Sequence, residues 1–582
     1  MWRRALLTAA TLTFCLADAT AAGDYELVMH LKHRGLPELQ KAFRQISDPD
    51  SARYLKFLSQ TELATLVGAT DQELEEARGW LLRLGAEPSS LRVSGLRDTM
   101  SARFSAPAGS ANHGVGVEDR GGWWTQLGAS QRPESVQFVV RRDHLTRSAA
   151  SGEKGRRSVF KGLNSSFGEY TVPKIKAAYG MPVDLVAGND TTLQMVWGPG
   201  TFGYSPLQLA AHKVAECPLL DLSKVHFDTA NHGKSGGDNF GEGNLDVKMI
   251  ASFGLNVKTI VSNTNTSAST EEGNGFGQAM LDFITDLAAR KVVPHVLSLS
   301  LGSLSSGSCK LLCESVGKEG KFTEGECNDF LQTQRQVCMF ISDDQTARIN
   351  TAFQLLAVRG VSVFGSSGDG GSHYSFQPFS GGAIADALSE VSCKYQMPVF
   401  PTGSPYIVSV GGTMWKGDGS HPVAWEEDKT YGTGGGFSWQ FGMPDWQKKA
   451  VAAYLVNTTG LPPASSFNKA GRAFPDISGV AVEGTSQSSP LVAGMFSMIV
   501  DKRLSKGLPA LGFVSPRLWK VAAAYPGEAF LDVTEGGTAL TCDNGFPAAP
   551  GWDAATGWGR PIWPGLLKHL GEDEVTADTL VI

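Results

Sequence analysis

The chain alternates between strand-like and helix-like segments from about residue 255 onward, and this alternation limits its fold more than any other feature. Short apolar runs rich in β-branched residues are separated by longer amphipathic runs. Strands are expected at 257–261, 292–301, 361–365 and 406–410, and helices at 277–291 and 345–359. This order predicts an α/β fold with a parallel sheet covered by helices on both faces. Functional residues of such folds lie at the carboxyl ends of strands and at helix N-termini.

Length, composition and charge exclude several classes of protein. The 582 residues exceed one ordinary domain, and 42% hydrophobic with 19% charged residues exclude intrinsic disorder and a coiled-coil rod. The 68 glycines, well above the usual ~7%, indicate many tight turns. The net charge of −7, without a long basic run, argues against a nucleic-acid partner.

Residues 1–22 have the pattern of a secretory signal peptide, with two arginines, an apolar run and small residues before the cleavage point. No other apolar run is long enough to span a membrane, so a soluble mature protein is expected. Secretion permits disulfide bonds. Without Cys15 the chain keeps seven cysteines, so at least one thiol is unpaired or bonded to another chain. Four glycosylation sequons agree with secretion: Asn164, Asn189, Asn265 and Asn457.

Residues 23–160 differ in character from the rest of the chain. Expected strands at 25–29 and 136–140, with helices at 37–44 and 71–84, indicate an α+β module. This module carries a net charge of +2, whereas residues 161–582 carry −10. A polar stretch with a dibasic pair at 148–157 indicates a protease-sensitive linker. The residues alone allow two interpretations, an independent domain or a propeptide.

The segment Gly484-Thr485-Ser486 precedes a buried apolar run that starts after Pro490. Proline and small residues favour the first turn of a helix, so Ser486 is expected at the positive end of the helix dipole. An ordinary N-cap serine would give a similar pattern. The longer pattern G-T-S-x-x-x-P nevertheless resembles the surroundings of the nucleophile in subtilisin-like serine peptidases.

A histidine-based triad is disfavoured. It would need an Asp at the end of the first strand of the sheet and a His on a following helix. The strand expected at 192–197 runs into Gly198-Pro199-Gly200 without an Asp. His232 lies in a stretch rich in Gly, Asn and Ser, which is typical of a loop.

Three carboxyl groups offer another chemistry. Glu242 and Asp246 are four residues apart, on one face of an expected helix, so they would share protons and titrate as a pair. Such a pair can act as a general base in acid, where an imidazole is protonated. Asp369 follows the strand at 361–365 in a Gly-rich turn, where a protonated carboxyl group can donate a hydrogen bond to an oxyanion. Alone, each pattern is common on solvated helices and in turns.

Taken in order, Glu242, Asp246, Asp369 and Ser486 resemble the sedolisin, or serine-carboxyl peptidase, family. Further similar segments lie at 434–451, 471–477 and 557–559. The resemblance covers nearly the whole chain after the signal and implies a subtilisin-like fold. It also implies a zymogen, with an inhibitory and folding propeptide at 23–160 and a peptidase domain at 161–582.

The resemblance implies a role for each of the four residues. Ser486 is the nucleophile that forms an acyl-enzyme, Glu242 is the general base, and Asp246 orients Glu242 and shares its proton. Asp369 is the oxyanion donor. An acidic optimum is expected, because Asp369 must keep its proton while Glu242 accepts one. Peptides or unfolded proteins are the expected substrates, and the similarity to the tripeptide-releasing branch of the family implies removal of tripeptides from amino termini. A lysosome, an acidic vacuole or the extracellular space is the expected location.

The resemblance also implies one structural calcium ion. The matching ligands are the carboxylates of Asp532 and Asp553 and the carbonyl oxygens of Val533, Ala549 and Gly551. Carboxylates and carbonyls are the ligands that calcium prefers.

The chain also departs from the family pattern. Glu483 stands where the family usually has a small residue, close to the expected nucleophile. After the strand at 296–302 the family commonly has an acidic residue near the substrate, whereas this chain has Ser303-Leu304-Ser305-Ser306 and then a Cys-rich insertion that reaches past Cys338. Because a free amine needs an acidic partner, an acid endopeptidase is the alternative to tripeptide release. An inactive binding relative and a neutral enzyme that uses His232 are less favoured. Cys393 and Cys542 lie where a family disulfide is expected.

Overall fold

The structure is a computed structural model of the whole chain. It describes residues 25–105, 132–143, 170–200, 202–229, 241–264, 275–334, 337–339, 341–373, 379, 381–417, 419 and 421–572. The expected signal and linker, His232, Asn164 and Asn265 lie outside these residues. The chain divides into two compact units. One contains residues 1–31, 71–93 and 99–149, and the other contains residues 32–70, 94–98 and 150–582.

The smaller unit is an antiparallel sheet with one long helix. Its strands have the order β2-β3-β1-β4. They are β1 (Tyr25–Leu31), β2 (Arg92–Val93), β3 (Thr99–Phe104) and β4 (Val136–Asp143), and the helix is α3 (Asp71–Arg83). Trp80 and Leu81 of α3 and Met100 and Phe138 of the sheet are buried apolar side chains of this unit. These elements agree with the α+β character expected from residues 23–160.

The larger unit contains a mostly parallel sheet, which confirms the predicted α/β fold. Its strands have the order β13-β12-β10-β8-β5-β7-β6, and β16 also pairs with β12. Every pairing is parallel except that of β12 with β13. The strands are β5 (Leu193–Pro199), β6 (Val225–Phe227), β7 (Lys258–Thr264), β8 (Val296–Leu299), β10 (Ser362–Ser366), β12 (Val408–Trp415), β13 (Pro422–Ala424) and β16 (Ile477–Val480). The strand expected at 292–301 is shorter than predicted, because Pro294 has no N–H for the ladder.

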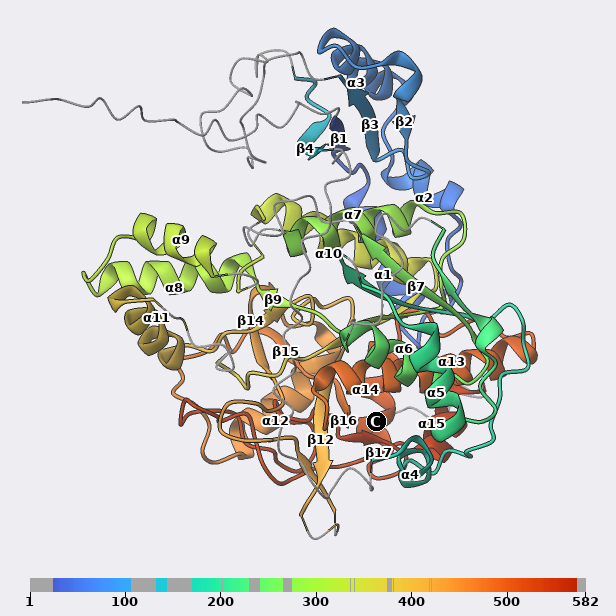
Figure 1. Cartoon of the computed structure of the whole chain (residues 1–582), viewed down its shortest axis with the longest axis vertical. Coiled ribbons are helices and arrows are strands. Elements are labelled where there is room, and N and C mark those ends of the chain that lie inside the picture. Colours follow the sequence, from blue (N-terminus) through green and yellow to red (C-terminus); the bar gives the residue numbers. More distant parts are fainter. Residues whose placement is uncertain are drawn as a thin grey trace, which may run out of the picture. The chain divides into compact units, whose positions relative to one another are not determined.

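Helices cover both faces of this sheet. In Figure 1, α7 and α10 lie on one side of it, while α6 and α13 pack together on the other. The helices of this unit include α1 (Leu36–Ser47), α2 (Gln60–Val67), α4 (Val172–Ala178), α5 (Pro206–Ala215), α6 (Gly241–Phe253), α7 (Gly275–Ala289), α10 (Asp343–Val358), α12 (Lys448–Asn457), α13 (Thr485–Ser505), α14 (Ser515–Ala524) and α15 (Trp563–Leu570). A capping box between Ser342 and Gln345 fixes the start of α10.

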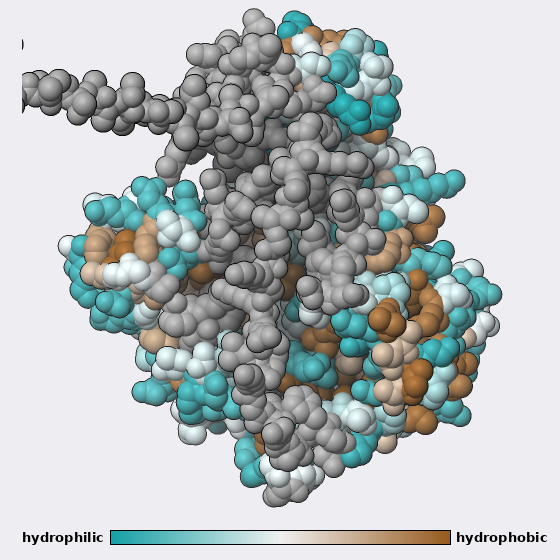
Figure 2. Space-filling view, in the orientation of Figure 1, coloured by the Kyte–Doolittle hydropathy of each residue, from teal (hydrophilic) through white to brown (hydrophobic). Residues whose placement is uncertain are grey.

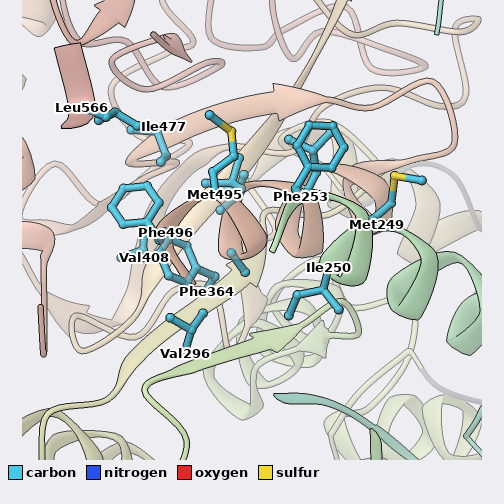
Figure 3. Packing of buried hydrophobic residues seen from close by; sticks show 14 of the residues in the cluster. Met249, Ile250, Phe253, Val296, Phe364, Val408, Ile477, Met495, Phe496 and Leu566 are labelled. Atoms are coloured by element: carbon cyan, nitrogen blue, oxygen red, sulfur yellow. The ribbon is translucent and has the colours of Figure 1, made fainter. Parts of the chain in front are cut away.

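The core of the larger unit lies between the sheet and the helices α6 and α13. Figure 3 shows Met495 and Phe496 of α13 beside Ile250 and Phe253 of α6, above Phe364 of β10. The rings of Phe364 and Phe496 are 4.9 Å apart. Because α13 is apolar over most of its surface, it is buried on all sides, as expected for a central helix.

A lobe with its own core is formed by α8 (Ser306–Lys318), α9 (Glu324–Thr333) and α11 (Ala383–Lys394), which lie together in Figure 1. Its disulfides are Cys309–Cys338 and Cys313–Cys327. The disulfide expected between Cys393 and Cys542 is present as well. Among the described cysteines Cys217 is free and buried, so the unpaired thiol expected from the odd count is assigned.

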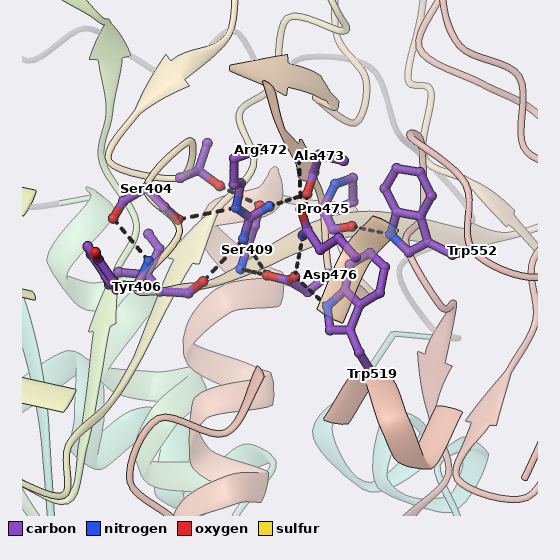
Figure 4. A network of polar contacts seen from close by, with 12 residues as sticks. Ser404, Tyr406, Ser409, Arg472, Ala473, Pro475, Asp476, Trp519 and Trp552 are labelled. Carbon is purple, nitrogen blue, oxygen red and sulfur yellow. Dashed lines mark hydrogen bonds and ion pairs between the residues drawn. The ribbon is translucent and has the colours of Figure 1, made fainter. Parts of the chain in front are cut away.

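A buried ion pair holds the segment that leads into β16. Figure 4 shows Asp476 between Arg472 and Trp519. The Arg472 guanidinium lies 2.5 Å from Asp476 Oδ2, and the indole N–H of Trp519 donates to Oδ1 at 2.7 Å. The backbone N–H of Ser409, in β12, donates to Oδ2 at 2.7 Å. These bonds join β12, β15 (Gly471–Phe474), β16 and α14, and β16 ends only four residues before Gly484.

Apolar side chains also lie on the surface of the larger unit. Leu207 and Val214 of α5 are exposed, and Figure 2 shows brown residues over this region. In the described part of the chain, no helix is long and apolar enough to cross a membrane.

We expect Asp476→Asn to lower the free energy of unfolding by about 3–5 kcal/mol, because it leaves the buried Arg472 without a counter-charge. The control is Asp445→Asn, which breaks an exposed pair with Lys448 and should leave stability nearly unchanged. Urea unfolding of the purified precursor, followed by tryptophan fluorescence, measures both. Equal midpoints for the two variants would contradict this account of Asp476.

Candidate active site

Helix α6 carries the expected carboxyl pair on adjacent turns. Glu242 lies in the first turn, where the helix dipole favours a negative charge, and Asp246 lies one turn later. Asp246 is fully buried, and the Ser300 hydroxyl, just beyond β8, donates to its Oδ1 at 2.8 Å. Oε1 of Glu242 and Oδ2 of Asp246 are buried and have no hydrogen-bond partner among the described residues. A proton shared by the pair would satisfy these two oxygens.

Burial raises the pKa of both carboxyl groups. For Asp246 the pKa lies well above its ordinary value, because burial and the charge of Glu242 both oppose ionisation. For Glu242 burial raises the pKa most, the nearby Ser486 hydroxyl acts against this effect, and the charge of Asp369 raises the pKa further. The two groups therefore titrate as a coupled pair, as the sequence predicts.

Ser486 is the second residue of α13, at the N-terminus of the helix, and its hydroxyl group lies close enough to Glu242 to lower the pKa of that carboxyl group. The preceding Gly484 has φ +88°, a conformation that favours glycine. Pro490 lies in the second turn rather than the predicted first turn. Because it has no N–H to bond to the carbonyl group of Ser486, that oxygen stays available, and the Ser300 hydroxyl lies 3.5 Å from it.

Asp369 lies in the turn after β10, on the other side of the helix start. Its Oδ1 accepts two hydrogen bonds from Thr485, one from the backbone N–H at 2.8 Å and one from the hydroxyl at 2.6 Å. Burial raises the pKa of Asp369, and the two bonds from Thr485 only partly offset this effect. The structure therefore brings all four predicted residues to the carboxyl edge of the sheet, around the N-terminus of α13.

This arrangement can perform acyl transfer. A hydroxyl group lies near a carboxyl group that can take its proton, and a second carboxyl group, whose pKa is raised, lies nearby to stabilise an oxyanion. A small hollow, with room for about one water molecule, adjoins the Asp369 turn. It is lined by glycine backbone and by apolar side chains that include Met397, Val399 and Phe474.

Two polar residues of the site had no predicted role. Thr485 was recognised only as part of the G-T-S pattern, although its hydroxyl binds Asp369. Ser300 follows a strand of alternating Leu and Ser, where only its place at the end of a buried strand could have indicated a role. Its carbonyl oxygen accepts from the Ser366 hydroxyl at 2.5 Å and lies 3.5 Å from the Ser486 hydroxyl oxygen.

Other positions singled out in the sequence do not belong to this group of catalytic candidates. Glu483 is exposed, and the charges that act on it are those of Lys248 and Glu216. None of the four candidate catalytic groups is among the charges that act on it. No acid follows β5, which agrees with the disfavoured His-based triad.

The residues expected to bind calcium lie together near the C-terminus. Asp553 is fully buried, and its carboxylate accepts only N–H and hydroxyl donors, from Ala549, Ala555 and Thr556. Burial raises its pKa to about 7. Asp532 accepts from the N–H of Gly551 at 2.8 Å, which joins the two acidic segments. The described residues hold no group of three or more His, Cys, Asp or Glu side chains placed to bind a metal, so this set depends on two carboxylates and on backbone carbonyls.

These residues fit a hard cation. The buried Asp553 carboxylate has no basic partner, and no described donor is bonded to the carbonyl oxygens of Ala549 or Gly551. Carboxylate and carbonyl oxygens of this kind are calcium ligands.

Comparisons with known proteins agree with these features. Residues 16–114 match the family "Pro-kumamolisin, activation domain". Tripeptidyl-peptidase 1 of Macaca fascicularis is 27% identical over 601 residues, which cover 95% of this chain and 93% of that protein. The Rattus norvegicus protein is 28% identical over 590 residues, 94% of this chain and 92% of that protein. A solved Pseudomonas sedolisin (serine-carboxyl proteinase), complexed with two molecules of pseudo-iodotyrostatin, has 20% identity and a TM-score of 0.48, and the match covers 69% of this chain and 98% of that one. The resemblance predicted from the motifs is confirmed.

Proposed function

We propose that this chain, which is a serine-type peptidase of the sedolisin family made as a zymogen with a propeptide, is activated by acid and removes tripeptides from peptide amino termini. The observation that carries the proposal is the position of the Ser486 hydroxyl at the start of α13, where it acts on the pKa of Glu242, while Ser300 connects Ser486 to the buried Asp246. The proposal divides the chain into a signal peptide at 1–22, a propeptide at 23–160 and a peptidase domain at 161–582.

The proposed reaction has two halves. Glu242 takes the hydroxyl proton of Ser486 while the serine oxygen attacks the peptide carbonyl carbon, and Asp369 hydrogen-bonds the oxyanion. The proton on Glu242 then passes to the leaving amine as the peptide bond breaks, which gives the acyl-enzyme. Water then loses a proton to Glu242 as it attacks the acyl carbon, and Glu242 returns that proton to the Ser486 oxygen as the acyl–serine bond breaks.

The raised pKa of Asp369 supports a working range in acid. Asp369 has to be protonated in order to donate, and burial raises its pKa so that it keeps its proton in mild acid. Asp246 is the more deeply buried member of the pair, so it holds the shared proton and leaves Glu242 as the base. Above the pKa of Asp369 the oxyanion donor is lost, and activity falls.

Tripeptide release is supported by the likeness to tripeptidyl-peptidase 1 over nearly the full length of both chains. It needs an acid that binds the free amine of the substrate. Glu427 offers one. Burial, Asp428 and Asp369 together raise its pKa, so it lies within electrostatic reach of the proposed oxyanion donor. The N–H of Gly432, at the end of the same loop, donates to the Asp369 carbonyl oxygen at 3.0 Å. The alternative is an acid endopeptidase of the same family.

Contacts within the larger unit support an inhibitory propeptide that docks on the peptidase domain. Arg348 of α10 donates to the carboxylate of Asp98 at 2.7 Å, and His33 lies 2.9 Å from the same oxygen. All three side chains are at most 4% exposed. Gln354, which lies on α10 like Arg348, donates to Gln40 of α1 at 2.7 Å. His33, Gln40 and Asp98 belong to the proposed propeptide.

His33 can make this docking sensitive to acid. Burial and the Arg348 charge lower its pKa below the ordinary value of about 6.5. A released propeptide would therefore bind a proton below pH ~6.5 that the docked one does not, so docking weakens as the pH falls from 6.5 to the lowered pKa. Burial acts to raise the pKa of Asp98, but Arg348 and His33 outweigh it and hold that pKa far below its usual range. Asp98 thus stays ionised in mild acid, and His33 is the group of the three that titrates there.

A structural calcium ion is part of the proposal. Asp532, Asp553 and the carbonyl groups of Val533, Ala549 and Gly551 would hold it, and it would stabilise the loops behind β16 without a part in acyl transfer. Trp552, next to Asp553, donates to the carbonyl oxygen of Pro475 at 2.9 Å, which connects these loops to the Asp476 segment.

The secretory pathway is the proposed route, since the chain has three disulfides. An acidic compartment or the extracellular space is the destination, and peptides or unfolded proteins are the substrates. Of the expected glycosylation sites, Asn457 is exposed at the end of α12.

We expect purified precursor to lose its propeptide and cleave peptides at about pH 4 but not at about pH 7. A peptide with a free amine and an apolar third residue should lose its first three residues, and the acetylated peptide should stay intact. Ser486→Ala and Glu242→Gln should each reduce the rate by about 10⁴-fold or more. Glu483→Gln is the control, because Glu483 is an exposed residue and none of the four proposed catalytic groups acts on its pKa. Mass spectrometry of the products measures cleavage. Internal cleavage of the acetylated peptide would favour the endopeptidase, and full activity of Glu242→Gln would exclude the mechanism.

His33→Gln should move the midpoint of propeptide release to lower pH by about 0.5–1 unit, because the variant keeps a hydrogen-bond donor but cannot take up a proton. Gel analysis of the precursor after incubation between pH 3.5 and 6.5 gives the midpoint. His226→Gln, at an exposed histidine, is the control. His33→Gln yields the same mature enzyme as the wild type, so a change in the specific activity of that enzyme would point to another cause. An unchanged midpoint would rule out His33 as the sensor.

Removal of calcium should destabilise the protein through Asp553. We expect a chelator to lower the melting temperature of the wild type by several degrees, and to leave that of Asp553→Asn nearly unchanged, because this variant no longer binds the ion. Calorimetric titration with CaCl2 should show one site in the wild type and none in the variant. A wild type without calcium-dependent stability would contradict the assignment.

A further inference from the structure

The side chain of Thr485 makes no contact with a substrate in the proposed mechanism, yet it is bound to one of the catalytic groups. Its hydroxyl oxygen accepts a hydrogen bond from the N–H of Gly368 at 3.1 Å. Its proton is then directed to Asp369 Oδ1, 2.6 Å away. The backbone N–H of the same residue donates to the same oxygen at 2.8 Å. Thr485 is buried, so water does not replace these bonds.

Two donors on one oxygen decide where a neutral carboxyl group carries its proton. Oδ1 cannot hold a proton while two other hydrogens point at it, so the proton of neutral Asp369 lies on Oδ2. No described residue donates to Oδ2. This oxygen lies against the backbone of Gly484, where a Cβ would come within 2.7 Å of it. Glycine at 484 thus leaves room for the oxygen that bears the proton.

We propose that Thr485 is a positioning residue, which holds Asp369 by Oδ1 so that Oδ2 keeps the proton and stays free to donate to the oxyanion. The inference rests on the proposed function and deepens it. The three residues Gly484, Thr485 and Ser486 then act as one unit: the first makes room for the donor, the second orients it, and the third is the nucleophile. The nucleophile and the oxyanion donor are thereby fixed to the same helix start, although they come from distant parts of the sequence.

The charged groups around Asp369 define what the test can detect. Glu242 of α6 and Glu427 of the neighbouring loop are the titratable groups on which the charge of Asp369 acts. Both are acids, so neither favours the ionised form of Asp369. The bonds from Thr485 do favour it. Loss of the hydroxyl should therefore raise the pKa of Asp369, while it also loosens the orientation of the group.

The test compares Thr485→Val, which keeps the shape but removes the hydroxyl, with Thr485→Ser, which keeps the hydroxyl. We expect Thr485→Val to lower kcat by about tenfold, the effect of one hydrogen bond to a catalytic group, with little change in KM. The alkaline limb of the kcat–pH profile should move to higher pH. Thr485→Ser should restore both values. Thr413→Val is the matched control, since it removes a buried hydroxyl that donates to the Gly479 carbonyl oxygen at 2.8 Å.

The outcomes separate the inference from the function on which it rests. If Thr485→Val lowers kcat equally at all pH values and leaves the alkaline limb in place, as a purely structural defect would, the inference is wrong. Wild-type kcat and profile in Thr485→Val would also overturn it, while Ser486→Ala still shows that the serine is essential. A wild-type enzyme without activity in acid would instead refute the proposed function. Should Thr485→Val fail to fold, Thr485→Ala gives the same comparison with a smaller side chain.

Discussion

Burial of three carboxyl groups without a basic partner is the physical constraint on which the proposed chemistry depends. Glu242, Asp246 and Asp369 are raised in pKa chiefly by the loss of water around them, and in the described part of the chain no Lys or Arg counters this effect. Asp476 is fully buried, as Asp246 is, but it is bonded to Arg472. Asp476, which holds the backbone, thus has a basic partner that neutralises its charge. The acids proposed to move protons have none among the described residues. An ionised carboxylate in such surroundings is costly, so these groups take up protons readily.

The packing of α13 against α6 creates that environment. Both helices are buried beneath the sheet, and their N-terminal turns meet at its carboxyl edge. Ser300 joins the two elements, since its hydroxyl binds Asp246 and its carbonyl oxygen lies close to the Ser486 hydroxyl. Pro490 leaves the Ser486 carbonyl without its helical partner, which opens the first turn to these contacts. Precise placement of a nucleophile needs such support from rigid elements.

The proposed docking of the propeptide uses the opposite electrostatic arrangement. Asp98 is buried, but Arg348 stabilises its charge, so its pKa is low and the pair persists in mild acid. His33 is buried as the neutral form beside that pair. A fall in pH can therefore act on two parts of the molecule in different ways. It protonates His33, which must stay neutral for docking, and it keeps Asp369 in the neutral form that catalysis needs.

Much of this molecule could be predicted from local patterns. The strand and helix periods gave the α/β fold, because periodicity reports which side of an element is buried. The G-T-S pattern and the spacing of Glu242 and Asp246 identified the helix starts that carry the site. The ends of single elements were harder to predict. Pro294 shortens β8, and Pro490 lies in the second turn of α13 although the sequence predicted the first. The contacts that keep α13 helical around Pro490 come from other elements.

What the sequence by itself determined was the set of reactive residues and the elements that bear them, since these depend on neighbours along the chain. Only the tertiary structure decided which of those residues meet. The bonds from Thr485 to Asp369, from Ser300 to Asp246 and from Arg348 to Asp98 join positions 54 to 250 residues apart. Their pKa values depend on burial, and burial is a property of the packed molecule that no local pattern contains.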